Sequence, residues 1–185
     1  GLAGGSSNAA AVLVGIDLLW DLGLTRSELQ ELGEVLGSDI PFCISGGTAL
    51  VTGRGKTISP LPALGGLYVV LGKYRSLQVS TPWAYKTYRQ QFGSQYVSDA
   101  AGLEERRHRV HSGPMVAAIL HQNGSQIGKL LHNDLQKVVL PAHPPVAKLR
   151  DALAASGGLG AMMSGSGPSV FALCESEAQA QDIYT

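Results

Sequence analysis

The sequence has little charge and no excess of either sign. Charged residues make up 15% of the 185 residues, and 14 basic side chains balance 14 acidic ones. Proteins that bind nucleic acid or anionic lipid need a basic patch, which this composition does not favour. No apolar run reaches the ~18 residues that a membrane-spanning helix requires. We therefore expect no nucleic acid and no membrane as partners, and small-molecule ligands instead.

Cysteine is also scarce, with only Cys43 and Cys174. Both lie inside apolar stretches, so we expect buried free thiols and not a disulfide framework. His108 and His111 are three residues apart, but no further His or Cys stands close to them. A solvated surface of mixed charge over residues 97–111 is therefore favoured over a metal site. We predict no metal ligands in this chain.

Glycine, in contrast, is abundant, and it is prominent in the first ten residues, GLAGGSSNAA. Gly4 and Gly5 allow positive φ and the close approach of another group. The next three residues supply short oxygens for a helix N-cap: Ser6, Ser7 and Asn8. We predict a largely buried helix that begins at about Asn8. Its free N–H groups and its dipole would stabilise an anion such as phosphate, although an ordinary serine-capped loop explains the same residues.

A second candidate is Asp39, in the run GSDIPF. Because Pro41 pushes Ile40 toward an extended conformation, we expect Asp39 in a tight connection between two elements. An aspartate at such a place commonly caps or turns the chain. Its apolar neighbours would equally hold the carboxylate partly desolvated beside a site. On the residues alone, both interpretations stay open.

Periodicity and turn residues predict both helices and strands along the chain. The expected helices cover residues 25–37, a segment that begins at Thr81, two short segments within 113–132, a segment that continues through residue 139, 144–156 and 177–185. A capping box of Thr25 and Glu28 begins the first of these, and two prolines begin the helix at residue 144. The HNDLQ segment is interpreted as a cap for the helix that continues through residue 139. The expected strands cover residues 48–52, 67–71, 161–163 and 170–174, and residues 58–64 are expected to be a connection. Thr81 is the expected N-cap of its helix. Tyr85 and Tyr88 share one face of that helix, so packing on the core is the simpler interpretation of both.

Near the end of the chain, SGSGPS separates two expected strands. A loop made mostly of glycine and serine can lie flat against a phosphate or a neighbouring loop. It can equally be a plain hairpin turn.

Five segments occur in the order GLAGGSSNAA, GSDIPF, VSTPWAYKTY, HNDLQ and SGSGPSVFAL. Together they resemble the GHMP kinases, and the match covers essentially the whole chain. The resemblance implies a two-domain α/β (α+β) GHMP kinase fold, with a truncated N-terminal domain over residues 1–65 and a ferredoxin-like C-terminal domain over residues 66–185. We expect the sequence to be a fragment that lacks the family's catalytic lysine and is inactive alone.

Within the family, the motifs resemble the branch that acts in the non-mevalonate isoprenoid pathway. The resemblance then implies ATP-dependent phosphorylation of the 2-hydroxyl of 4-diphosphocytidyl-2-C-methyl-D-erythritol, with ATP and Mg²⁺. The alternatives are a GHMP kinase for homoserine or a mevalonate derivative, and a non-catalytic nucleotide-binding module. The expected compartment is a bacterial cytoplasm or a plastid stroma. The sequence leaves a homodimer open.

The resemblance also implies roles for individual residues. Asp39 is the catalytic aspartate, since transfer to an alcohol needs a carboxylate that accepts the hydroxyl proton. Thr81 and Tyr85 line the substrate side, with Tyr85 stacking on cytosine. Gln136 stands where the family pattern has a glutamate. The ATP phosphates are wrapped by Gly1, Leu2, Ala3, Gly4, Gly5, Ser6, Ser7, Asn8 and Ala9, and this loop is buttressed by Gly165, Ser166 and Gly167.

Overall fold

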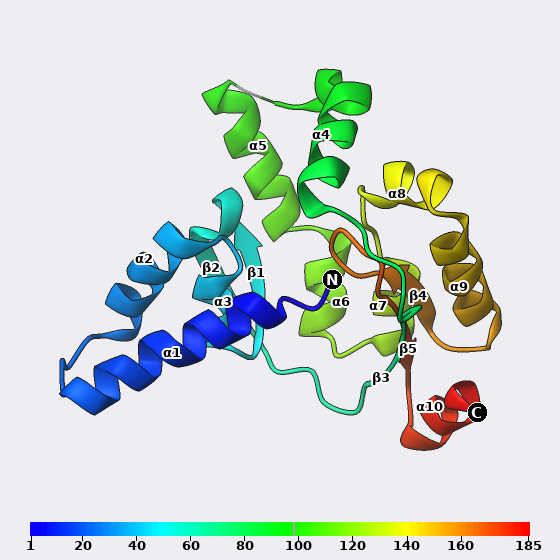
Figure 1. The fold of residues 1–185 in the computed structure, drawn as a ribbon, viewed down its shortest axis with the longest axis horizontal. Helices are drawn as coiled ribbons and strands as arrows, with labels where there is room; N and C mark the ends of the chain where they lie inside the picture. The colour runs from blue at the N-terminus through cyan, green and yellow to red at the C-terminus, as the bar shows by residue number, and fades with distance from the viewer. Residues whose placement is uncertain (98) are drawn as a thin grey trace. The chain divides into compact units, whose positions relative to one another are not determined.

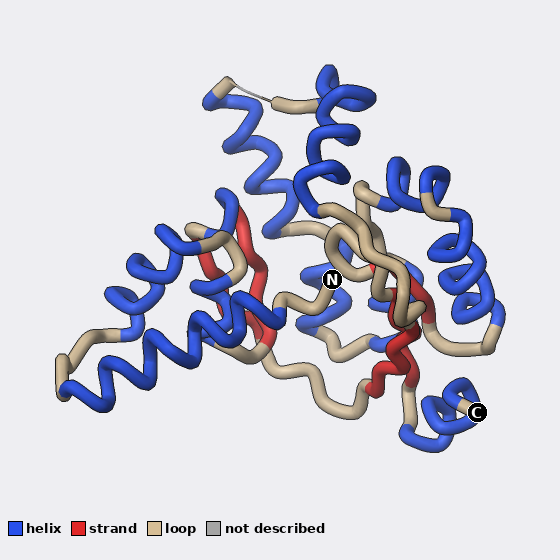
Figure 2. The backbone as a smooth tube through the Cα atoms, viewed as in Figure 1, coloured by secondary structure: helices blue, strands red, loops and turns tan. Residues whose placement is uncertain are grey.

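The structure is a computed structural model that describes residues 1–97 and 99–185, except for the side chain of Arg54 (Figures 1 and 2). Contacts divide the chain into two compact units. The N-terminal unit is Ala3–Ala63, and the C-terminal unit is Leu64–Thr185 together with Gly1–Leu2. The domain limits expected from the sequence, residues 1–65 and 66–185, stay a prediction.

The N-terminal unit consists of three helices and a β-hairpin. Helix α3 (Ile40–Ser45) packs against both α1 (Gly4–Trp20) and α2 (Arg26–Leu36). After α3, the antiparallel strands β1 (Thr48–Thr52) and β2 (Thr57–Leu61) are joined by the short 3₁₀ helix η1 (Gly53–Gly55). Strand β2 occupies residues that we expected to form a connection, and that prediction was wrong.

Local sequence explains how two of these helices begin. The capping box of α2 is confirmed, since the Thr25 hydroxyl accepts the Glu28 N–H and the Glu28 carboxylate accepts the Thr25 N–H. The prediction for Ile40 was wrong, because α3 begins there. Pro41 lies in the first helical turn, where its missing N–H costs no hydrogen bond.

Helix α1 departs from the prediction in two ways. It begins at Gly4, four residues earlier than expected, and no side chain caps it. It is also largely exposed, since only Ala10 is buried while Leu19 and Trp20 are 77% and 66% exposed. The apolar pattern predicted a buried helix, but within the described residues α2 and α3 cover only part of its surface.

The C-terminal unit is built on a three-stranded antiparallel sheet with the order β3-β5-β4 (Figure 2). Strand β5 (Val170–Cys174) lies between β3 (Tyr68–Gly72) and β4 (Gly160–Met163). The helices are α4 (Thr81–Phe92), η2 (Gly93–Gln95), α5 (Ala100–His111), α6 (Pro114–Leu120), α7 (Gly124–Lys129), α8 (Gln136–Ala142), α9 (Pro144–Ala155) and α10 (Glu177–Tyr184). The order strand, helices, two strands, helix agrees with the expected ferredoxin-like arrangement.

The largest core cluster of this unit joins α4, α8 and α9 to the sheet. Its buried members are Ala84, Tyr88, Leu135, Val138, Val139, Val146, Met163 and Val170. Both cysteines are free, as predicted, but only Cys174 is buried, and its burial raises the pKa of its thiol. Among the described residues, no helix is both long and apolar enough to cross a membrane.

Candidate functional site

Asp39 lies at the N-cap position of α3, and its side chain does not cap the helix. Only its main-chain carbonyl is used there, accepting the Cys43 N–H at 3.1 Å. The side chain is exposed, so among the described residues none shields the Asp39 carboxylate from water as we had considered. The carboxylate is therefore not tied up in a structural role that would compete with proton acceptance.

The turn before Asp39 is shaped by contact with the hairpin. Gly55 has φ +91°, and a Cβ at this position would lie 2.0 Å from the Ser38 carbonyl oxygen. Only glycine allows this backbone to approach so closely in this conformation. The hairpin thus contacts the main chain of the residue immediately before Asp39.

The beginning of α1 presents free main-chain donors. The first helical hydrogen bond runs from the Ser7 N–H to the Ala3 carbonyl at 2.8 Å, so the N–H groups of the three preceding residues have no partner within the helix. Positive φ occurs at Ala3 (49°) and not at Gly4 or Gly5, which corrects our interpretation of these glycines. A Cβ on Gly5 would meet no atom within 4 Å, which leaves its surface open to a ligand.

In the C-terminal unit, the glycine loop between β4 and β5 contacts two predicted site residues. The Ser164 hydroxyl donates to the Gly1 carbonyl, and the Ser166 and Thr81 hydroxyls are 2.7 Å apart. Ser80, and not Thr81, is the N-cap of α4, which corrects the expected boundary by one residue. Because Ser80 caps the helix, the Thr81 hydroxyl is free to bond the loop.

Asn133 holds the same loop from its other side. Its side-chain amide donates to the carbonyls of Met163 and Gly165, both at 2.8 Å, and its side-chain oxygen accepts the Leu135 N–H at 3.0 Å. From the sequence we considered the HNDLQ segment a helix cap. The structure shows that its asparagine fixes the backbone on which Gly165 and Ser166 are placed.

Gln136 also bonds this region, through its side-chain oxygen, which accepts the Met163 N–H at 3.1 Å. A glutamate at this position would offer the same acceptor. The departure from the family pattern therefore keeps the hydrogen bond that the site needs.

We expect Gln136→Glu to leave the melting temperature and the kinetics nearly unchanged. Gln136→Leu should lower the unfolding free energy by about 1–3 kcal/mol, because the N–H of the buried Met163 would lose its hydrogen-bond partner. Thermal unfolding of the two variants measures the difference. Equal stability of the two would show that this hydrogen bond is unimportant.

A pocket of about 770 Å³ opens in the C-terminal unit between α4, α5 and the HNDLQ segment. Figure 1 labels the two helices, α4 and α5, that contribute residues to its lining. Tyr85 lines it and is 56% exposed, whereas Tyr88 is 9% exposed and belongs to the core cluster. The full lining is Tyr85, Tyr88, Gln95, Tyr96, Arg106, Arg109, Val110, His132, Asn133, Asp134, Leu135 and Gly165. Core packing thus describes Tyr88 but not Tyr85, and Thr81 is not among the lining residues.

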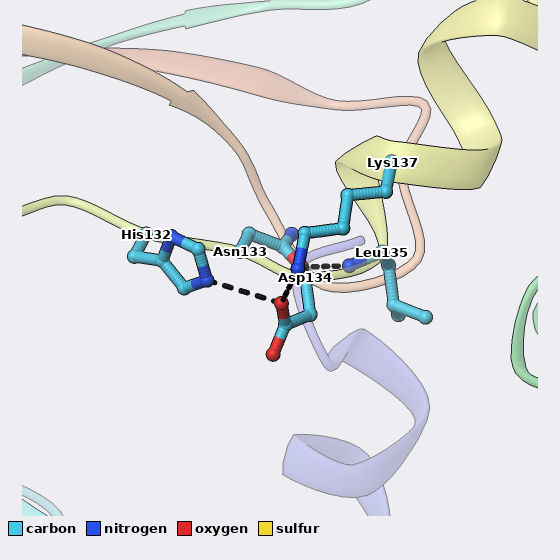
Figure 3. Close-up of polar contacts among 5 residues, drawn as sticks. All are labelled: His132, Asn133, Asp134, Leu135 and Lys137. Atoms are coloured by element: carbon cyan, nitrogen blue, oxygen red, sulfur yellow. Dashed lines mark hydrogen bonds and ion pairs between the residues drawn. The ribbon is translucent and has the colours of Figure 1, made fainter. Parts of the chain in front are cut away.

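Asp134 is the centre of a polar cluster at the wall of this pocket (Figure 3). Its carboxylate accepts a hydrogen bond from the Lys137 ammonium at 2.7 Å. The same carboxylate oxygen lies 3.1 Å from His132 Nε2. The bond from Lys137 lowers the pKa of Asp134, and the same bond raises the pKa of Lys137. The Lys137 ammonium also lies over the rings of Tyr88 and Phe92, and burial raises the pKa of Tyr88.

The shifted pKa values predict how this cluster depends on pH. Because the pKa of Asp134 is lowered on folding, its stabilising effect is present above the ordinary value of ~3.9 and is lost as the pH falls through the lowered pKa. The effect of Lys137 is present below ~10.4 and is lost as the pH rises through its raised pKa.

We therefore expect Asp134→Asn to lower the unfolding midpoint at pH 7, and we expect this effect to be smaller at pH 3, below the ordinary pKa of ~3.9. Denaturant unfolding of both proteins at the two pH values measures it. The same difference at pH 3 and pH 7 would contradict the role of the ionised carboxylate.

Several residues of the pocket were not predicted as site residues. The prediction of a solvated surface over residues 97–111 included residue 98, which lies outside the described residues. Part of this segment does form a solvated surface of mixed charge, since the Glu104 carboxylate pairs with Arg107 and His108 on the exposed side of α5. Arg106 and Arg109 line the pocket instead. Their spacing of three was visible in the sequence, but the fold alone shows which helix face meets the pocket.

Among the described residues, no cluster of three or more His, Cys, Asp or Glu side chains could hold a metal ion. A magnesium ion here would need most of its oxygen ligands from another molecule, as is usual for Mg²⁺ bound with nucleotide phosphates.

Two family descriptions match this chain. Residues 1–47 match the "GHMP kinases N terminal domain" and residues 115–185 match "GHMP kinases C terminal". A protein from Nostoc punctiforme is 66% identical over 98% of this chain, and one from Synechocystis sp. is 61% identical over 99%. Both are named 4-diphosphocytidyl-2-C-methyl-D-erythritol kinase. The chain spans 57% and 58% of their lengths.

Solved structures give the same assignment of fold. The crystal structure of a 4-(cytidine 5'-diphospho)-2C-methyl-D-erythritol kinase matches 98% of this chain with a TM-score of 0.67 and 26% identity, and 59% of that protein is covered. A homoserine kinase from Cytophaga hutchinsonii matches 91% of this chain with a TM-score of 0.68 and 24% identity, with 54% of it covered, and supports the fold alone.

The chain therefore belongs to the GHMP kinases. Within that family it is similar to the 4-diphosphocytidyl-2-C-methyl-D-erythritol kinases of cyanobacteria. The predicted family and the predicted fold class are thus confirmed.

Proposed function

We propose that the full-length protein transfers the γ-phosphoryl group of ATP to the 2-hydroxyl of 4-diphosphocytidyl-2-C-methyl-D-erythritol. The observation that carries the proposal is the loop that bonds both Gly1 and Thr81 and whose Gly165 lines the same pocket as Tyr85. A single segment thus contacts the start of the phosphate loop and the substrate side. The identity to relatives of this name supports the choice of alcohol.

In this proposal the first nine residues of the chain bind phosphate, and Asp39 accepts the proton. The free N–H groups that begin α1 would stabilise the phosphates through hydrogen bonds and the helix dipole. The loop from Gly1 to Ala9 would wrap them. Asp39 would accept the proton of the attacking hydroxyl, because its carboxylate is exposed and free of a capping bond.

The residues of the C-terminal unit would bind and orient the alcohol. Tyr85 would stack on cytosine, and Thr81 would contact the substrate near Ser166. Gly165, Ser166 and Gly167 would support the phosphate loop, together with the hydrogen bond that the neighbouring Ser164 donates to Gly1. Magnesium would enter with ATP, held mainly by the phosphate oxygens, and would neutralise charge on the transferred group.

The wider organisation follows from the same proposal. Residues 1–65 would belong to the nucleotide-binding domain and residues 66–185 to the C-terminal domain. The bacterial cytoplasm or the plastid stroma stays the expected compartment, and a homodimer remains open to measurement.

The experiment is a comparison of alcohols with the purified full-length protein. We expect ATP-dependent phosphorylation of the cytidyl substrate with kcat/KM at least about a thousandfold above that for homoserine or mevalonate, since a missing set of buried polar contacts costs discrimination of that order. ADP release coupled to product detection by mass spectrometry measures it. Preference for homoserine or mevalonate would favour the other kinases of the family, and nucleotide binding without turnover would favour a binding module.

Tyr85 tests the substrate side. Because stacking uses the ring face, Tyr85→Phe should be nearly silent, whereas Tyr85→Ala should raise KM for the cytidyl substrate roughly tenfold and leave KM for ATP unchanged. The core residue Tyr88 is the matched control, since Tyr88→Ala should lower the melting temperature markedly. A stability loss in Tyr85→Ala, with equal damage to both KM values, would contradict the stacking role.

A further inference from the structure

The pocket of the C-terminal unit contains two guanidinium groups to which the proposed function assigns no role. Arg106 and Arg109 are three residues apart on α5, so they share one helix face, and Val110 on the same face also lines the pocket. In the described ranges, neither Arg106 nor Arg109 has an ion-pair partner. The third arginine of this segment that is close to them, Arg107, is paired with Glu104 instead.

The charge of the pocket wall favours an anion. Among the described residues that line the pocket, only Asp134 is acidic, and its carboxylate is already engaged by Lys137 and His132. The two arginines are thus left without a protein carboxylate among the described residues. A guanidinium presents a planar fork of donors that matches phosphate oxygens, so an anionic ligand would be bound here by charge-assisted hydrogen bonds.

The rest of the lining favours an aromatic group beside that anion. Tyr85, Tyr88 and Tyr96 contribute rings to the same pocket, and a volume of about 770 Å³ is in the range of sites for small molecules and cofactors. A flat base bearing a short chain of phosphates has both properties. At Gly165 the pocket also reaches the loop that bonds Thr81.

We infer that Arg106 and Arg109 bind the diphosphate group of the cytidyl substrate, with the base held among the tyrosines. This inference rests on the proposed function and extends it to the part of the substrate between the base and the reacting alcohol. It makes the two arginines determinants of specificity for a nucleoside diphosphate ester over a simple alcohol.

The test uses the full-length protein and two probes, cytidine and cytidine diphosphate. The wild type should bind the diphosphate more tightly than the nucleoside. In Arg106→Gln/Arg109→Gln this advantage should fall at least about tenfold, the lower end for a lost hydrogen bond to a charged group, while cytidine affinity stays the same. Calorimetry measures both, and KM for the cytidyl substrate should rise by a similar factor.

The matched control is Arg107→Gln, which removes the same charge from the same helix but away from the pocket lining. It should leave the advantage of the diphosphate intact. KM for ATP separates the two sources of phosphate, and it should not change in the double variant. All variants should keep the wild-type melting temperature, because these arginines are exposed.

The outcomes separate the inference from the function on which it rests. A double variant that keeps the full advantage of the diphosphate, in a protein that still phosphorylates the cytidyl substrate, overturns the inference alone. A rise in KM for ATP instead would assign the arginines to the nucleotide cosubstrate and also overturn it. A wild type that binds neither cytidine nor its diphosphate would overturn the proposed function and the inference together.

Discussion

Asp39→Asn in the full-length protein is expected to lower kcat at least about a hundredfold, the usual scale for the loss of a general base, with little change in ATP affinity. The amide keeps the shape of the side chain but cannot accept the hydroxyl proton in the same way. Because the Asp39 side chain makes no capping bond and is exposed, the exchange should leave the fold and the melting temperature intact. Steady-state kinetics and thermal unfolding of the same preparation measure both effects.

Asp21→Asn provides the control for this variant. Asp21 is another exposed aspartate of the N-terminal unit, and it ends α1 in the left-handed conformation with φ 51°. Asparagine adopts that conformation readily, so the control should keep both stability and turnover. Near-wild-type turnover in Asp39→Asn would contradict the role of Asp39 as the base and leave it only a structural role in the turn.

Gly5→Val should raise the dissociation constant of ATP at least about a hundredfold. Phosphate would bind to the first N–H groups of α1, and losing two charged hydrogen bonds of ~1.5–3 kcal/mol each exceeds the ~2.7 kcal/mol that this factor requires. A branched side chain on Gly5 would stand where the ligand approaches. We expect the fold to tolerate the exchange, since Gly5 is helical and a Cβ there would meet no atom within 4 Å.

Gly15→Val is the matched control, because Gly15 lies in the same helix and a Cβ there would also meet nothing within 4 Å. Both variants should show the same small change in melting temperature, and only Gly5→Val should lose ATP binding by calorimetry. If Gly5→Val binds ATP as well as Gly15→Val does, the phosphate site lies elsewhere.

Local signals in the sequence were sufficient for much of the fold. The Thr25 capping box, the proline pair that begins α9 and the glycine loop between two expected strands are short-range features, and the structure confirms the elements expected beside them. Boundaries failed where an unusual backbone conformation decides them. Ala3 takes a left-handed conformation that its side chain does not favour, so the start of α1 could not be placed from propensity.

The candidate site was predictable to the extent that motif resemblance identifies residues. The motifs did not indicate which residues distant in the chain contact the site residues. The residues around Asn133 indicate a helix cap, but its side-chain amide donates hydrogen bonds to carbonyls thirty and thirty-two residues away. Arg106 and Arg109 lie in a stretch whose composition is typical of a solvated surface, and only the structure shows that they line a pocket together with residues of α4.

The central claim is the transfer of phosphate to a tertiary hydroxyl of a cytidyl substrate. The most direct measurement is ³¹P and ¹³C NMR of the reaction of the full-length protein with ATP, Mg²⁺ and 4-diphosphocytidyl-2-C-methyl-D-erythritol. We predict equimolar ADP and one new phosphate monoester coupled to carbon 2, with the diphosphate bridge of the substrate intact. Phosphate on another hydroxyl, or only inorganic phosphate, would contradict the account.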